Sequence, residues 1–150
     1  MTKGSMRRYA LDLKSGTCTD VRELSDVSME LPVIHHSFAR RTGSYRFVYA
    51  CGVNKSAPNE FYNQLVKVDV STGLSMEWYR EGHFPGEPVF VPSPHAERED
   101  DGVLLSVVLN TETNTSYLLV LDAKNLQQIA KAFVPHSILF GYHGTYLNKN

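Results

Sequence analysis

Histidine side chains are the groups in this sequence best suited to bind a transition metal, because neutral imidazole is a good ligand for iron, copper and zinc. Six are present: His35, His36, His83, His95, His136 and His143. No pair has the HxxxH spacing of a helical metal site, and no HExxH motif occurs. His35 and His36 are adjacent, so on a strand they would point to opposite faces. The spacing alone therefore indicates no metal site.

Motifs for other chemistries are absent from the sequence. It contains no GxSxG motif for a hydrolase nucleophile, and neither GxGxxG nor GxxxxGK[ST] for a phosphate-binding loop. The net charge of -1, with both signs mixed along the chain, excludes the basic surface typical of a nucleic-acid-binding protein. We interpret the one acidic run, residues 97–101, as a solvated turn.

The two cysteines, Cys18 and Cys51, have no CxxC spacing. A small secreted domain held by disulfides would normally use more cysteines, so we interpret both as free, buried thiols in a reducing compartment. The first residues form no signal peptide, and no window contains the roughly 20 apolar residues of a membrane span. The sequence therefore predicts a soluble, cytoplasmic chain.

The apolar residues form short runs of the kind found in β-strands, each bounded by Gly, Pro, Asn or Asp. These runs lie at residues 45–53, 64–70, 87–91, 102–109 and 117–122. Alternation within 64–70 predicts a strand with one wet face, whereas the continuous run 102–109 predicts a strand buried on both faces. Residues 126–133 suit either a helix or a strand, and we favour the strand. The sequence thus predicts an all-β fold.

A weak internal repeat organises these strands. In each copy an apolar strand ends at an aspartate, and a glycine or asparagine that tolerates positive φ follows before a second strand. The copies are Asp12 with Gly16, Asp69 with Gly73, and Asp122 with Asn125. A period near 50 residues is typical of propeller blades, but an ordinary meander or sandwich explains it equally well. Three blades would leave exposed strand edges, so the propeller interpretation predicts a piece of a longer chain or an open form.

Three stretches together resemble one family, the carotenoid cleavage oxygenases. The first is MELP at residues 29–32, followed by the strand YRFVY at 45–49. The second is HFPGEPVFVP at 83–92, continuing through EDDGVLLSVV at 99–108. The third is YLLVLDA at 117–123 with FGYHG at 140–144. The resemblance covers nearly the whole chain and is to the carboxy-terminal third of family members.

The resemblance implies a fold and a metal site. Family members are seven-bladed propellers, so residues 1–150 would form a carboxy-terminal fragment, a partial β-propeller of about three blades. Their Fe2+ ion is held by four histidines from different blades, and the FGxHG motif makes His143 the candidate ligand here. Gly141 and Gly144 would allow a sharp turn beside it. Glu30 and Glu87 match the glutamates that hydrogen-bond the ligand imidazoles, and the other five histidines match no ligand position.

The resemblance also implies a reaction, namely cleavage of a conjugated double bond by O2 in a carotenoid, apocarotenoid or stilbene-like substrate, giving two carbonyl products. No organic cofactor would be needed. The three other histidine ligands would lie outside this chain, which by itself is expected to be inactive. Regions absent here would provide any peripheral membrane contact. The alternative is a non-catalytic all-β module that associates with itself through open blade edges.

Overall fold

A computed structural model describes residues 4–58, 61–141 and 143–147, and within them it contains eleven strands and one helix. The elements in chain order are β1 (Met6–Asp12), β2 (Thr17–Ser25), β3 (Glu30–Val33), α1 (His36–Thr42), β4 (Phe47–Gly52), β5 (Gln64–Asp69), β6 (Ser75–Tyr79), β7 (His83–Pro85), β8 (Val89–Pro92), β9 (Gly102–Asn110), β10 (Thr115–Asp122) and β11 (Gln128–Val134). The predicted all-β fold is therefore confirmed, with strands within or close to all the expected runs.

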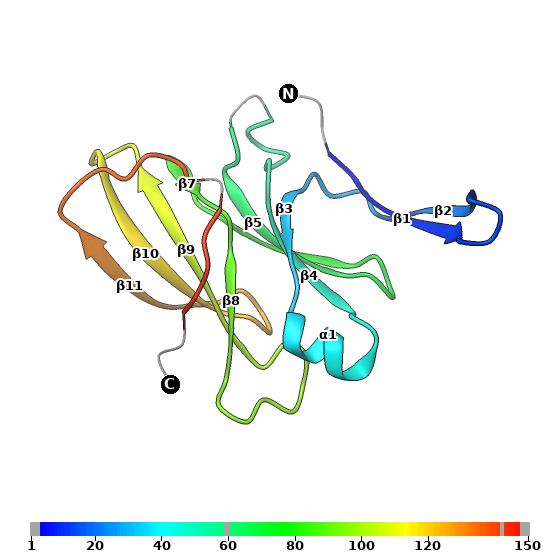
Figure 1. Ribbon diagram of the computed structural model, residues 1–150. Helices are drawn as coiled ribbons and strands as arrows, with labels where there is room; N and C mark the ends of the chain where they lie inside the picture. The colour runs from blue at the N-terminus through cyan, green and yellow to red at the C-terminus, as the bar shows by residue number, and fades with distance from the viewer. Residues whose placement is uncertain (1–3, 59–60, 142, 148–150) are drawn as a thin grey trace.

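The strands form three antiparallel sheets that fan out side by side (Figure 1). The first sheet contains only the hairpin β1-β2, and the middle sheet has the order β3-β4-β5-β6. The third has the order β11-β10-β9-β7, with β8 also paired to β9. In the middle sheet the strands follow one another in chain order, as they do across a propeller blade. Three sheets of this kind match the predicted partial propeller of about three blades.

In each of the three repeats, the first strand ends in the same five-residue turn. In each, the backbone N–H of the last turn residue donates to the aspartate carbonyl at 2.8 Å; the pairs are Gly16–Asp12, Gly73–Asp69 and Leu126–Asp122. The last residue has a positive φ every time, 58° for Leu126. The prediction that Asn125 takes this conformation is therefore wrong by one position. Leu126 accepts the unfavourable φ because its side chain is buried in the core.

The middle sheet is packed on both faces. One face of β4 and β5 packs against the third sheet through Tyr49, Cys51 and Leu65. The opposite face packs, through Ala50 and Val66, on the side of the β1–β2 hairpin. The predicted wet face of residues 64–70 is therefore wrong, because β5 is central and even its polar residues are buried as far as Lys67. The prediction for residues 102–109 is also wrong, since β9 leaves Val107 38% exposed.

The helix α1 is an element that the sequence did not predict. It begins after His35, whose ring is buried against Phe90 with 4.6 Å between centroids, and it ends at Gly43 with a φ of 73°. Its seven residues are too few to show a helical apolar period, so local pattern carries no signal for it. Residues 126–133, the helix considered from sequence, contribute mainly to strand β11, as favoured.

The prediction of two buried thiols is right for one cysteine only. Cys51 is buried in β4 and its thiol lies 3.7 Å from the carbonyl of Pro85, whereas Cys18 is exposed on β2. Burial raises the pKa of the Cys51 thiol above its usual value, which keeps this thiol protonated and unreactive. No helix in the part of the chain that the structure describes has the length and apolar character needed to cross a membrane.

The acidic run at residues 97–101 is not simply a solvated turn, as the sequence suggested. Glu99 is 7% exposed, and its carboxylate accepts the backbone N–H groups of Arg46 and Phe47 at 2.8–2.9 Å. Asp100 accepts a hydrogen bond from the buried Lys67 ammonium at 2.9 Å. Both acids precede β9 and reach across to β4 and β5, so the run joins the third sheet to the middle sheet.

Two buried tyrosines in the shared core differ in how their hydroxyls are satisfied. Tyr49 donates to the carbonyl of Ala123 at 3.0 Å. The Tyr117 hydroxyl is the one buried side-chain N or O atom among the described residues that has no hydrogen-bond partner. Burial raises the pKa of Tyr117 to about 12 and also raises that of Tyr49. The neutral phenols are therefore favoured in the folded state.

Replacing Tyr117 by phenylalanine is expected to raise the free energy of unfolding by about 1 kcal/mol, because it removes a buried polar group without a partner. Tyr49→Phe, the matched control, is expected to lower it by about 1 kcal/mol through the lost hydrogen bond. Because the Tyr117 pKa is higher in the folded state, this phenol does not make stability depend on pH below the unfolded value near 10, and it lowers stability as the pH rises from there through about 12. Tyr117→Phe should therefore lose less stability at alkaline pH. Urea unfolding at pH 7 and 10.5 measures both effects, and equal destabilisation by the two variants would contradict the assignment.

Candidate metal centre

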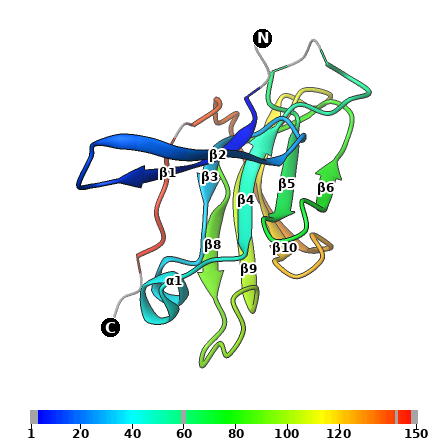
Figure 2. The ribbon, with the colours of Figure 1, turned by 90° about the vertical axis from the view of Figure 1, so that its right-hand side faces the viewer.

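The segment that carries His143 runs back from β11 toward β8 without forming a strand. We call residues 137–141 and 143–147 the C-terminal segment; Figures 1 and 2 show it alongside β8. It is held by the fully buried Ser116, whose hydroxyl accepts the N–H of Ile138 at 2.8 Å and donates to its carbonyl at 3.1 Å. Side-chain contacts of this kind set its path, because it has no strand partner to do so.

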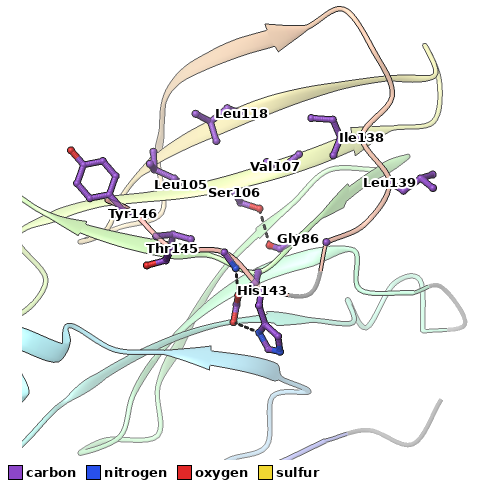
Figure 3. Close-up of a pocket in the computed structure, with 14 residues that line it drawn as sticks. Gly86, Leu105, Ser106, Val107, Leu118, Ile138, Leu139, His143, Thr145 and Tyr146 are labelled. Carbon is purple, nitrogen blue, oxygen red and sulfur yellow. Dashed lines mark hydrogen bonds and ion pairs between the residues drawn. The ribbon is translucent and has the colours of Figure 1, made fainter. Parts of the chain in front are cut away.

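His143 and Glu87 are joined directly. The Nδ1 atom of His143 lies 3.2 Å from Oε1 of Glu87, and the backbone N–H of Gly144 donates to Oε2 of the same carboxylate at 2.9 Å. The Glu87 side chain is 14% exposed, whereas the imidazole is 79% exposed. In Figure 3 the ring of His143 points away from Leu118 and Ile138. This arrangement fixes one ring nitrogen on a carboxylate and presents the rest of the ring outward.

The expected role of the neighbouring glycines is wrong. Neither Gly141 nor Gly144 has a positive φ, so no turn reserved for glycine aims the imidazole. A side chain at Gly141 would meet nothing within 4 Å, and one at Gly144 would make an ordinary contact with Val89 at 3.6 Å. The contacts of Glu87 with both His143 and the following backbone N–H orient the ring instead.

Glu30 lies at the same end of the molecule but does not contact His143. It is exposed at the first position of β3, opposite Cys51 of β4, and the Cys51 thiol reaches the carbonyl of Pro85, two residues before Glu87. No hydrogen bond joins Glu30 to His143 in the described structure. Both glutamates thus stand near the start of a strand, β3 or β8, in neighbouring sheets, and among the described residues only Glu87 has a histidine partner.

The backbone beside Glu30 has an unusual conformation that the sequence did not reveal. Leu31 has a φ of 55°, and the β3–β4 register shifts between Glu30 and Val33. A bulge redirects the side chains next to it, and a bulky residue at positive φ costs energy that is most often retained near functional sites. The following Pro32 disfavours a regular helical continuation, but nothing in the sequence indicated the sign of φ at Leu31.

A mostly apolar pocket of about 270 Å³ lies beside the His143–Glu87 pair (Figure 3). Its walls come from β8 and the residues before it, β9, β10 and the C-terminal segment; the apolar members include Val89, Leu105, Val107, Leu118, Ile138 and Leu139. The Ser106 hydroxyl donates to the Gly86 carbonyl at 2.8 Å at its base. A neighbouring pocket of about 530 Å³ shares Glu87 and residues 144–146 with it and extends to α1.

The other histidines are not gathered around this site. His35 and His83 are buried, and their Nδ1 atoms are hydrogen-bonded to the carbonyls of Glu99 at 3.0 Å and Glu81 at 2.7 Å. The remaining three, His36, His95 and His136, are exposed. Across residues 4–58, 61–141 and 143–147, no group of three or more His, Cys, Asp or Glu side chains is arranged to hold a metal ion. Of the FGYHG motif, Tyr142 lies outside the described residues.

Comparison with known proteins agrees with the resemblance seen in the sequence. The family model described as RPE65, retinal pigment epithelial membrane protein, matches residues 1–148. The mitochondrial carotenoid-cleaving dioxygenase of Homo sapiens is 40% identical over 121 residues, covering 79% of this chain and 20% of that protein. The chloroplastic carotenoid cleavage dioxygenase 8 of Arabidopsis thaliana is 41% identical over 106 residues, covering 71% and 18%. The chain thus spans about a fifth of the length of these relatives.

Solved structures agree with the fold as well. The cobalt-substituted apocarotenoid oxygenase (ACO) of Synechocystis superposes with a TM-score of 0.88 at 29% identity, covering 98% of this chain and 31% of that one. An ACO/RPE65 chimera superposes with a TM-score of 0.87 at 30% identity. Both are β-propeller enzymes. This chain therefore belongs to the RPE65 and carotenoid cleavage dioxygenase family.

Proposed function

We propose that this chain supplies one ligand, His143, and two supporting carboxylates, Glu87 and Glu30, to a non-haem Fe2+ centre. The reaction would be cleavage of a conjugated C=C bond of a carotenoid, apocarotenoid or stilbene-like substrate by O2, giving two carbonyl products. The observation that carries the proposal is the 3.2 Å contact between the His143 ring and the Glu87 carboxylate. The family relationship supplies the substrate class and the reaction type.

The donors present fit such a centre. A carboxylate that accepts the proton on Nδ1 selects the tautomer with a free lone pair on Nε2, and it raises the basicity of that nitrogen. The Glu87 side chain is largely buried, and its carboxylate also accepts the backbone N–H of Gly144. Both features hold the carboxylate in this geometry. Iron, when bound, would supply the activation of O2, while the protein contributes ligand geometry and an apolar environment for the substrate. One of the matching solved structures is a cobalt-substituted apocarotenoid oxygenase, which is consistent with a divalent metal in this family.

We further propose that residues 1–150 correspond to the carboxy-terminal part of a complete propeller, and that the isolated chain is inactive. One imidazole is too few ligands to hold Fe2+ tightly, and the other three histidines would come from the rest of the propeller. Membrane contact would likewise come from outside these residues. The cytoplasmic location expected from sequence stays a prediction, and the human and Arabidopsis thaliana relatives named above are mitochondrial and chloroplastic.

A second candidate function is a non-catalytic module that associates with itself. The observation in its favour is the first hairpin, which exposes several large apolar side chains; they are Tyr9, Leu11, Leu13 and Val21. Such a two-stranded sheet is marginally stable alone and has unpaired edges. Analytical ultracentrifugation of the chain tests this second candidate, because the module predicts concentration-dependent oligomers.

The proposed function is tested by grafting. Residues 4–147 would replace the matching third of Synechocystis apocarotenoid oxygenase, which superposes over 98% of this chain. The hybrid is expected to contain about one iron per chain, measured by anaerobic metal analysis, and to bleach an apocarotenoid with consumption of one O2 per molecule cleaved. A folded hybrid that binds no iron would refute the proposal.

Glu87→Gln is expected to weaken iron binding or activity of this hybrid by roughly 10–100-fold, because an amide cannot offer the same acceptor charge to the His143 ring. Isothermal titration with Fe2+ under argon measures the affinity, and steady-state bleaching measures the rate. Glu97→Gln is the matched control, since Glu97 is exposed in the loop before β9. Equal affinities for the Glu87→Gln hybrid and the unmodified one would show that this carboxylate does not support a ligand.

A further inference from the structure

The C-terminal segment has an anchor that the iron proposal does not use. Phe140, three residues before His143, packs edge-to-face on Phe61 with 4.7 Å between ring centroids, and its ring lies 5.7 Å from that of Tyr62. Phe61 and Tyr62 also contact each other at 4.5 Å. Both come from the loop between β4 and β5, so this aromatic cluster ties the middle sheet to the segment that follows the third sheet.

The loop that presents Phe61 and Tyr62 is itself held by buried amides. The backbone N–H of Asn54 donates to the Asn63 side-chain carbonyl at 2.7 Å, and its side-chain amide donates to Gln64 at 2.9 Å. Asn54, Asn63 and Gln64 are all buried. A backbone bond from Asn63 to the carbonyl of Gly52 at 3.0 Å closes the base of the loop. The two aromatic rings therefore lie next to a buried, hydrogen-bonded loop base, which suits a positioning element.

The C-terminal segment needs such an anchor close to His143. Its bonds to Ser116 end at Ile138, and a side chain at Gly141 would meet nothing within 4 Å. Among the described residues between Ile138 and His143, Phe140 is the side chain that packs on another sheet, and the Glu87 contacts with His143 and Gly144 follow it. His143 thus follows an aromatic attachment point at Phe140 and itself takes part in the second one, at the Glu87 carboxylate.

We propose that Phe61, Tyr62 and Phe140 are positioning residues for His143, acting through the backbone rather than by contact with the ring. The cluster holds the C-terminal segment at the place where the Glu87 carboxylate can accept a hydrogen bond from the His143 ring. Loosening it would let the imidazole leave the carboxylate while the sheets stay folded. The effect on His143 stands by itself, and only the consequence for iron rests on the proposed function.

The first arm of the test uses the 150-residue chain and the ring nitrogens of His143, observed by 15N NMR at fixed pH. Phe140→Leu and Phe61→Leu are expected to lower the ratio of carboxylate-bound to free imidazole by on the order of 2–10-fold. This factor corresponds to the interaction free energy of one aromatic pair. Phe140→Tyr keeps the ring and should restore the signal. Phe133→Leu is the control, since Phe133 is 79% exposed on β11. His143 signals that Glu87→Gln shifts but both leucine variants leave unchanged would overturn the inference.

The second arm uses the hybrid oxygenase. Phe140→Leu is expected to weaken Fe2+ binding and lower kcat by several fold. KM should change little, because Phe140 does not line the apolar pocket beside His143. Phe140→Tyr should recover both values. If the unmodified hybrid binds no iron, the proposed function fails, and the NMR arm still decides the positioning role. If the hybrid binds iron equally well with Phe140→Leu, the inference is wrong even though the function stands.

Discussion

His143→Ala in the hybrid oxygenase is expected to abolish stoichiometric iron binding and carotenoid bleaching, weakening iron affinity by more than roughly 100-fold. Loss of a carboxylate behind a ligand already costs roughly 10–100-fold, so loss of the ligand itself must exceed that range. The substitution removes an imidazole that is 79% exposed, so it is expected to leave the fold intact. Metal analysis and isothermal titration measure the affinity, and circular dichroism verifies the fold.

His136→Ala is the matched control for this prediction. His136 is also exposed, lies seven residues earlier, and has no place in the proposed centre. It should leave iron content and bleaching rate unchanged. Each variant keeps five of the six histidines of the chain. Non-specific metal binding would therefore affect both variants equally. A His143→Ala hybrid with undiminished iron would assign the ligand to another residue and remove the basis for the oxygenase proposal.

Asp100→Ala is expected to lower the free energy of unfolding of the chain by about 3–5 kcal/mol, because it leaves the Lys67 ammonium buried without its counter-charge. The Lys67 and Asp100 side chains are 5% and 16% exposed, and the ammonium also donates to the carbonyl of Lys124 at 2.9 Å. Its charge lies 4.1 Å from the centre of the Phe47 ring. Urea unfolding at neutral pH, followed by fluorescence, measures the change.

Two further variants decide why Asp100 matters. Lys67→Met combined with Asp100→Ala should recover most of the lost stability, since replacing both partners of a buried pair is often neutral. Asp101→Ala, the neighbouring control, removes a partly exposed ion pair with Lys124 at 3.4 Å and should cost less than about 1 kcal/mol. A double variant as unstable as Asp100→Ala alone would show that Asp100 acts through something other than the charge of Lys67.

The Lys67–Asp100 pair also bears on the interpretation of a motif. The acidic residues at 99–101 are part of the resemblance to the oxygenase family, yet Glu99 and Asp100 hold β4 and β5 against the third sheet. Arg46 adds a pair with Asp69 at 2.6 Å, which holds the pKa of that carboxyl well below its usual range. Residues that are typical of an enzyme family can therefore have a structural role, which here is to join two sheets.

Local sequence determined the strands and their hairpins. Apolar runs and the Asp-to-Gly turns predicted the all-β fold because strand formation and turn geometry depend on residues within a few positions of each other. The sequence did not predict which faces are wet. Lys67 is buried although its type favours exposure, because β5 lies between two packed sheets and Asp100 supplies the counter-charge. That outcome depends on residues 33 positions apart.

For the site, the sequence by itself predicted His143, Glu87 and Glu30 through family motifs, and the resemblance implied that the three other histidine ligands lie outside this chain. Only the tertiary structure decided that Glu87 contacts His143 across 56 residues and that Glu30 has no such contact. It also decided that Phe61 packs on Phe140. The physical reason is that hydrogen bonds and ring contacts require closeness in space, which the packing of whole sheets creates and which short-range patterns do not encode.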